Sequence, residues 1–190
     1  MRAIEPVDIA GWGYWASDGI GGDHSWTDYL LAIDQDLADS RVHGWKPKLR
    51  SDIVAAARFD RGLDQLRECA TDHVPRSLVH NDLFNRNALV EAGQITGVFD
   101  WGNALIGDHL YDIALACFWQ PWLPKIDEHL LLDLVRSQRD STSGDPEQRF
   151  RTCLLHIGLQ HMAYQAFLED RREVGAVADR MDVVTSVRWF

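Results

Sequence analysis

Between residues 78 and 119, polar side chains stand at the ends of short apolar runs: His80, Asp82, Asn87, Asp100, Asp108 and Asp112. Two β-type runs, 88–90 and 95–99, are separated by residues 91–94, which predicts a β-hairpin with a short loop. Antiparallel strands joined by a short loop start and finish at the same edge. We therefore expect Asn87 and Asp100 to face one space, with Asp82 on the preceding loop.

The residue types at this edge point to a particular chemistry. Amide and carboxylate oxygens from Asn87 and Asp100 suit Mg²⁺, which typically takes one or two protein ligands and completes its shell with water and substrate phosphates. Asp82 is then free to accept a proton. A base and two metal ligands without a Ser-His or Cys-His nucleophile indicate phosphoryl transfer, where catalysis is mostly positioning and charge neutralisation.

The rest of the chain reads as helical, which predicts a mostly helical α+β fold. Ser25 with Asp28 predicts a helix with an apolar stripe that reaches Leu37. Further helices are predicted after Asp52, after Asp108 up to the prolines at 121 and 124, from Asp145 through a stripe that ends at Leu168, and over 173–188. Residues 1–24 are rich in glycine and aromatic residues and read as irregular.

Composition limits the function further. A chain of 190 residues, 46% hydrophobic, fits one domain, and a net charge of −10 argues against nucleic-acid binding. An acidic surface suits a cationic substrate, although acidity serves solubility more often. No apolar segment reaches membrane-spanning or signal-peptide length, and Cys69, Cys117 and Cys153 share no C-x-x-C spacing. We expect a cytoplasmic protein with free, buried thiols and no membrane partner.

The motifs H-N-D-L-x-x-x-N at residues 80–87, D-W-G at 100–102 and G-D-x-x-Y-D-I-A at 107–114 resemble the protein-kinase-like fold. They are most similar to the aminoglycoside phosphotransferases, in particular to the hygromycin B phosphotransferases. The segments GWGYWASDGIGGDHSWTDYLLAI, LVHNDLFNRNALV, ITGVFDWGNALIGD, FWQPWL and LLHIGLQHMAYQ carry this resemblance over most of residues 11–185.

By residue, the resemblance implies that Asp82 is the catalytic base, that Asn87 and Asp100 hold Mg²⁺, and that His80 braces the loop. Asn81 departs from the Gly or Ala usual after that histidine. We expect structural roles for Asp108, which caps a helix and bonds the catalytic-loop backbone, and for Asp112 one turn further on. His161, Trp119 and Trp122 are interpreted as packing residues. The sequence leaves the nucleotide-binding residues unknown.

The kinase-like fold also has an N-terminal nucleotide lobe, with a Gly-rich strand pair and a strand Lys. Here the glycines at 11, 13, 19, 21 and 22 are not framed by alternating strands, and the first lysine is Lys46. The resemblance therefore implies an irregular segment 1–24 followed by the C-terminal lobe at 25–190, with the nucleotide lobe absent. We expect such a chain to bind ATP weakly, on the order of millimolar.

A missing lobe should leave an apolar face uncovered near Trp12, Tyr14 and Trp15. We expect either homo-oligomerisation through this face or docking of these aromatic residues on the chain itself.

Two functions stay open from the sequence. The first is an ATP-dependent kinase that phosphorylates a hydroxyl of a small molecule, either a cationic aminoglycoside or a macrolide, choline, homoserine or another alcohol. The second is a non-catalytic remnant that binds a cationic small molecule or a protein partner.

Overall fold

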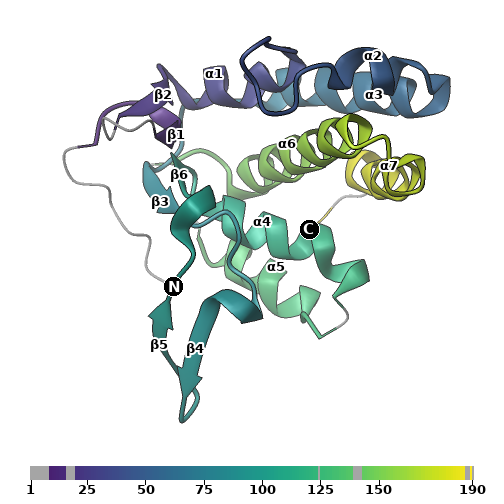
Figure 1. The fold of residues 1–190 in the computed structure, drawn as a ribbon. Helices are drawn as coiled ribbons and strands as arrows, with labels where there is room; N and C mark the ends of the chain where they lie inside the picture. The colour runs from purple at the N-terminus through teal and green to yellow at the C-terminus, as the bar shows by residue number, and fades with distance from the viewer. Residues whose placement is uncertain (1–8, 16–19, 124, 139–142, 187–188, 190) are drawn as a thin grey trace.

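A helical body with two small antiparallel sheets at one side forms this chain in a computed structural model that describes residues 9–15, 20–123, 125–138, 143–186 and 189 (Figure 1). The strands are β1 (Trp12–Trp15), β2 (Gly21–Asp23), β3 (Ser77–Val79), β4 (Ala88–Glu91), β5 (Gln94–Val98) and β6 (Leu105–Gly107). The helices are α1 (Trp26–Leu31), α2 (Trp45–Arg50), α3 (Ile53–Cys69), α4 (Leu110–Trp119), α5 (Glu128–Arg136), α6 (Pro146–Phe167) and α7 (Arg171–Ser186). The predicted α+β, mostly helical class is confirmed.

Helix starts follow the capping residues read from the sequence. The Ser25 hydroxyl accepts a hydrogen bond from the Asp28 amide at 3.0 Å, and the Asp52 carboxylate accepts from the amides of Val54 and Ala55. Asp145 caps α6 in the same way through the Gln148 amide. Each side chain accepts from otherwise unpaired N–H groups of a first turn, so local sequence determines where these helices begin.

Helix ends were predicted less well. The first helix ends at Leu31 and continues as a 3-10 turn, and Leu37 is 51% exposed, so the predicted stripe was too long. Tyr164 and Leu168 are likewise exposed at the end of α6. The short α2 was not predicted. The last helix begins at Arg171, and residues 187–188 of its predicted range lie outside the described part of the chain.

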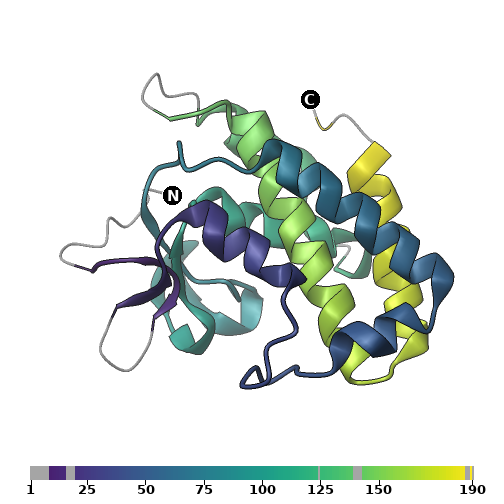
Figure 2. The same cartoon turned by 90° about the horizontal axis from the view of Figure 1, so that it is seen from above.

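Helix α6 is the centre of the hydrophobic core. It packs against α2, α3, α4, α5 and α7, and in Figure 2 it is the long light-green helix that crosses the helical body. From Arg149 to Leu159 every residue except Arg151 is buried, so its apolar residues do not form a single stripe. Cys117 and Cys153 are buried free thiols, and Cys69 is a free thiol that is only partly buried.

The expectation that residues 1–24 are irregular is wrong for the described part of that segment. Strands β1 and β2 pair and continue the sheet in the order β2-β1-β6-β3. Glycines permit this pairing, because a Cβ on Gly11 would lie 2.2 Å from the carbonyl oxygen of Gly21. Glycine has low strand propensity, and the main partner β6 lies about 90 residues away, so no local pattern revealed the strands.

The N-terminal aromatic residues pack on the chain itself. The ring centroid of Trp12 lies 6.1 Å from that of Trp26, and Tyr14 stands edge-on to Tyr29 at 5.8 Å. Trp26 is only 1% exposed, so β1 covers part of the core. The side chain of Trp15 lies outside the described part of the chain. Docking of Trp12 and Tyr14 on the chain itself is thus observed.

The buried histidine of α6 should make the protein sensitive to acid. His156 Nδ1 and the Tyr111 hydroxyl form a hydrogen bond of 2.8 Å, and burial lowers the pKa of His156 from 6.5 to about 3. The unfolded chain binds this proton below pH 6.5 and the folded chain does not. The free energy of unfolding should therefore fall with pH between about 6.5 and 3, by up to about 1.4 kcal/mol per pH unit.

Urea unfolding between pH 7 and pH 4 measures this slope. We expect a shallower slope for His156→Gln, which cannot titrate and keeps an acceptor for Tyr111. The exposed residue His24 gives the matched control, His24→Gln. Equal slopes for His156→Gln and the unchanged protein would contradict the assignment.

No helix in the described part of the chain has both the length and the apolar character needed to cross a membrane.

Candidate functional site

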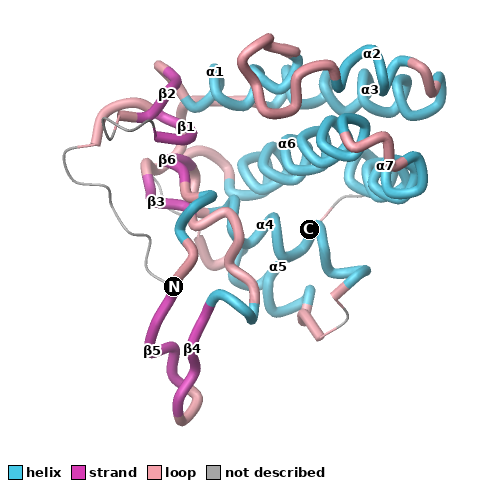
Figure 3. Tube along the Cα trace, in the orientation of Figure 1, coloured by secondary structure: helices cyan, strands magenta, loops and turns pink. Residues whose placement is uncertain are grey.

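The hairpin of β4 and β5 sets the geometry of the site. Its loop is tighter than predicted: Ala92 and Gly93 alone connect the strands, with φ of 49° and 78°. Positive φ at both positions is typical of the turn that matches strand twist. At the open end, the Phe99 amide donates to the Asn87 carbonyl at 3.1 Å. Asn87 and Asp100 therefore flank the same edge, and the loops that carry the site meet there (Figure 3).

Asn87 is joined directly to Asp82. Its side-chain nitrogen donates to the Asp82 carbonyl at 2.7 Å and to Asp82 Oδ2 at 3.0 Å. Both partners are acceptors, so the amide nitrogen must face Asp82 and the amide oxygen must point away. Within the described residues, Asn87 Oδ1 accepts no hydrogen bond. The side chain is only 4% exposed, so a buried amide is oriented with its oxygen available to a ligand.

Asp100 lies at the exit of β5 in the left-handed region, with φ 64° and ψ 59°. Asp and Asn adopt this conformation more readily than most residues. The residue is exposed, and a 3-10 turn over Trp101–Asn103 follows it. Asp100 therefore directly follows the residue that is bonded to Asn87, and its side chain is accessible to solvent.

His80 connects the two loops. Its Nδ1 accepts from the Asp82 amide at 3.2 Å, which leaves Nε2 to carry the proton and donate to the Phe99 carbonyl at 3.0 Å. Its ring lies 4.6 Å from that of Trp101. His80 thus links the backbone at Asp82 to the residue before Asp100.

Asp112 and Asp108 form hydrogen bonds with different parts of the chain. Asp112 accepts from the backbone amides of His80 at 3.0 Å and Asn81 at 2.8 Å. Burial raises the pKa of Asp112, and those two N–H donors oppose the rise. Asp108 accepts from the Leu110 amide at the start of α4 and forms a buried ion pair with Arg149. The expectation that Asp108 bonds the catalytic-loop backbone is therefore wrong, because the described bonds come from Asp112.

The sequence reasoning missed three residues near the site. Arg86 lies 3.8 Å from Asp82 Oδ1, Arg149 pairs with Asp108, and Tyr14 receives a hydrogen bond from Asn81. For Tyr14 the sequence held one signal: its partner Asn81 stands where the resemblance leads us to expect Gly or Ala.

Trp119 and Trp122 pack at the end of α4. Trp119 lies edge-on to Trp122 at 5.2 Å and to His161 at 4.7 Å. Burial lowers the pKa of His161 to about 4, so this histidine is neutral at pH 7. These contacts are those of packing residues.

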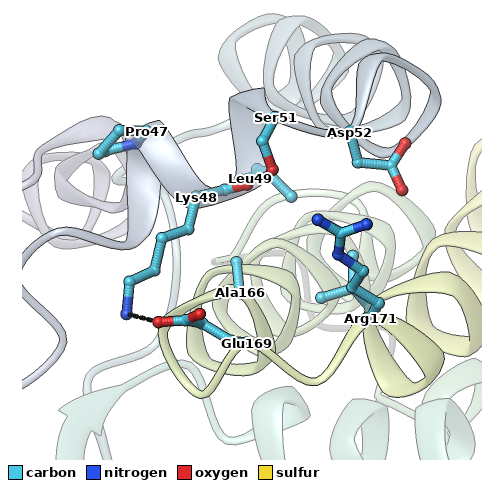
Figure 4. A pocket seen from close by; sticks show the side chains of 9 residues that line it. Pro47, Lys48, Leu49, Ser51, Asp52, Ala166, Glu169 and Arg171 are labelled. Atoms are coloured by element: carbon cyan, nitrogen blue, oxygen red, sulfur yellow. Dashed lines mark hydrogen bonds and ion pairs between the residues drawn. The ribbon is translucent and has the colours of Figure 1, made fainter.

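A cavity of about 340 Å³ lies away from this site, among α2, the end of α6 and the start of α7 (Figure 4). Lys48 crosses its side to pair with Glu169 at 2.9 Å. None of the predicted site residues lines it. Among the described residues, no group of three or more His, Cys, Asp or Glu side chains is arranged to hold a metal. An amide and one carboxylate, as in Asn87 and Asp100, form a smaller set that Mg²⁺ accepts.

A mostly helical body with small antiparallel sheets matches the C-terminal portion of the kinase-like phosphotransferase fold. A family model described as "Phosphotransferase enzyme family" matches residues 20–149, and the chain belongs to this family.

Relatives agree with this assignment. Hygromycin-B 4-O-kinase of Escherichia coli is 32% identical over 189 residues, which cover 97% of this chain and 52% of the relative. Homoserine kinase of Neisseria meningitidis serogroup B (strain ATCC BAA-335 / MC58) is 37% identical over 61 residues, 32% of this chain and 20% of the relative. The chain thus spans about half the length of the hygromycin kinase.

Solved structures show the same fold. Aminoglycoside phosphotransferase APH(4)-Ia superposes with a TM-score of 0.73 at 28% identity and covers 94% of this chain and 57% of its own. A ternary complex of a thermostable mutant of that enzyme with AMP-PNP and hygromycin B gives a TM-score of 0.72 at 30% identity, over 93% of this chain and 57% of its own.

Proposed function

We propose that this chain is the catalytic lobe of an ATP-dependent small-molecule kinase of the aminoglycoside phosphotransferase type. In this proposal Asp82 is the general base and Asn87 and Asp100 bind Mg²⁺. One observation supports it most: Asp82 fixes the Asn87 amide nitrogen, which leaves the amide oxygen available to a ligand at the hairpin edge that Asp100 follows. His80 and Asp112 hold the backbone of this loop from two sides.

The base would act through Asp82 Oδ1. Oδ2 already accepts from Asn87, and the side chain is 19% exposed, so it is shielded but accessible. An alcohol that hydrogen-bonds to Oδ1 would lose its proton to the carboxylate as its oxygen attacks the γ-phosphorus of ATP, and ADP would leave as the bond from that phosphorus to the β–γ bridging oxygen breaks. Mg²⁺ bound by Asn87 and Asp100 would supply neutralisation of the phosphate charge. Placement of the hydroxyl is the task of Asp82 and of the loop that holds it.

We propose an amino alcohol as the substrate. The names of the relatives include a hygromycin B kinase and homoserine kinases, and both named substrates carry hydroxyl and amino groups. A net charge of −10 favours a cationic ligand through long-range attraction. We place the protein in the cytoplasm, where ATP is available.

Self-association is part of the same proposal, but at a different surface from the one expected. The hairpin exposes four apolar side chains: Leu89 at 59%, Val90 at 65%, Ile95 at 62% and Phe99 at 44%. An apolar hairpin exposed on both faces favours contact with another surface.

Transfer of the labelled γ-phosphate of ATP to an added alcohol tests the proposal. Hygromycin B, homoserine and choline form the panel, with amine-free glycerol as the control for charge. We expect Mg²⁺-dependent product with at least one amino alcohol. Binding of the aminoglycoside without any phosphate transfer would instead support a non-catalytic binding protein.

Removing the charge of Asp100 should weaken metal binding. Asp100→Asn keeps a residue that tolerates φ 64° and removes one anionic ligand. We expect Mg²⁺ affinity with ATP to fall about tenfold or more, since losing even groups that only support metal ligands costs about 10- to 100-fold. Calorimetric titration of the metal measures this without any turnover. Asp133→Asn, on an exposed face of α5, is the matched control, and equal affinity in both variants would exclude Asp100 as a ligand.

A further inference from the structure

A tyrosine far from the catalytic loop in sequence is bonded to that loop. The Tyr14 hydroxyl accepts from Asn81 Nδ2 at 2.9 Å and from Gln160 Nε2 at 3.3 Å. Asn81 immediately precedes Asp82. One phenolic oxygen therefore joins strand β1, the loop of the proposed base and helix α6.

The sheet explains how this contact is reached. Tyr14 of β1 is paired with Leu105 of β6, and Leu105 is paired in turn with Val79 of β3. Three residues in a row thus span β1, β6 and β3, roughly 9.6 Å from the first strand to the third. The catalytic loop begins directly after Val79, so a side chain as long as tyrosine reaches it across the middle strand. At the other end of β1, Arg76 donates to the Gly11 carbonyl at 2.6 Å and keeps the strand in register.

Asn81 is held at two points. Its φ is 58°, a left-handed conformation that asparagine adopts more readily than most residues. Asp112 holds the Asn81 amide, which fixes the peptide before this residue. The hydrogen bond from the Asn81 side chain to Tyr14 restrains the residue a second time. Together the two contacts fix the orientation of the backbone that leads into Asp82. The Gly or Ala usual in the family at this position has no side chain able to donate such a bond.

We propose that Tyr14 is a positioning residue for the phosphoryl-transfer reaction: through Asn81 it holds the catalytic loop so that Asp82 faces the substrate hydroxyl. The proposal rests on the proposed function of Asp82. It assigns the strand pair β1-β2 a catalytic purpose beyond covering the core. The Tyr14 ring contributes packing against Tyr29, and the hydroxyl contributes the positioning.

Tyr14→Phe separates these contributions, because it keeps the ring and removes only the hydroxyl. We expect the backbone amides of Asn81 and Asp82 to exchange with deuterium about three- to tenfold faster, as for loss of one neutral hydrogen bond. Tyr164→Phe is the matched control, since Tyr164 is 46% exposed on α6 and its hydroxyl bonds no described residue. Unchanged exchange of both loop amides in Tyr14→Phe would overturn the proposal, whether or not the chain transfers phosphate.

Kinetics distinguish positioning from a purely structural effect. We expect Tyr14→Phe to lower kcat about three- to tenfold with little change in KM for ATP and only a small shift in the midpoint of urea unfolding. In an Asn81→Ala background the same substitution should have no further effect on kcat, since its partner is already gone. Full additivity of the two substitutions would overturn the route through Asn81. An inactive unchanged protein with faster exchange in Tyr14→Phe would count against the proposed function and leave the contact itself supported.

Discussion

Asp82→Asn should lower the turnover number for phosphoryl transfer about 10²- to 10⁴-fold, the usual contribution of a general base. The amide oxygen of the new side chain can still accept from Asn87 Nδ2, as Asp82 Oδ2 does at 3.0 Å. The backbone contacts of the loop, from Asp82 N to His80 and from its carbonyl to Asn87, involve no side-chain charge. The geometry therefore stays and only the basic group is lost. Steady-state rates with Mg·ATP and an amino alcohol measure the effect.

Nucleotide binding separates this result from misfolding. We expect the affinity for Mg·ATP, measured by calorimetry, to change little in Asp82→Asn, since Asp82 is not a proposed metal ligand. Asp64→Asn, an exposed change on α3, controls for the loss of one negative charge. Turnover equal to that of the unchanged protein would remove Asp82 from the role of base.

Breaking the buried ion pair should produce the largest loss of stability. Arg149 Nε and Nη2 donate to the two oxygens of Asp108 at 2.8 and 2.7 Å, and the two side chains are 1% and 0% exposed. Arg149→Met removes one partner and leaves a carboxylate in the core. We expect the free energy of unfolding to fall by about 3–5 kcal/mol, since most of the cost is that unpaired charge. Urea unfolding at pH 7 measures it.

A surface pair gives the comparison. Arg50 and Asp60 make the same two-bonded arrangement, with side chains 40% and 48% exposed. Arg50→Met should cost only about 0–1 kcal/mol. The double variant Arg149→Met with Asp108→Asn should recover part of the stability by removing the remaining charge. An equal loss of free energy of unfolding in Arg149→Met and Arg50→Met would show that the cost of breaking the Asp108 pair does not come from its burial.

The sequence alone was enough to predict the features that depend on residues close together in the chain, namely helix starts and the hairpin. Ser25, Asp52 and Asp145 identify helix starts because their side chains accept from amides two or three residues on. The hairpin was predictable for the same reason, and its order along the chain already placed Asn87 and Asp100 at one edge. The motif around Asp82 indicated the family, which the comparisons show.

Only the tertiary structure decided the contacts between distant segments. Tyr14 and Asn81 are 67 residues apart, and Asp108 and Arg149 are 41 apart. Strand β1 pairs with β6, and β2 pairs with β1, whereas their own sequence is too rich in glycine to predict strands. Such contacts depend on how the segments pack in space, and no periodicity in the sequence records that packing. The sequence therefore supplied the residues that we propose for the reaction, Asp82, Asn87 and Asp100, whereas the fold determined which residues hold the loop around them in place.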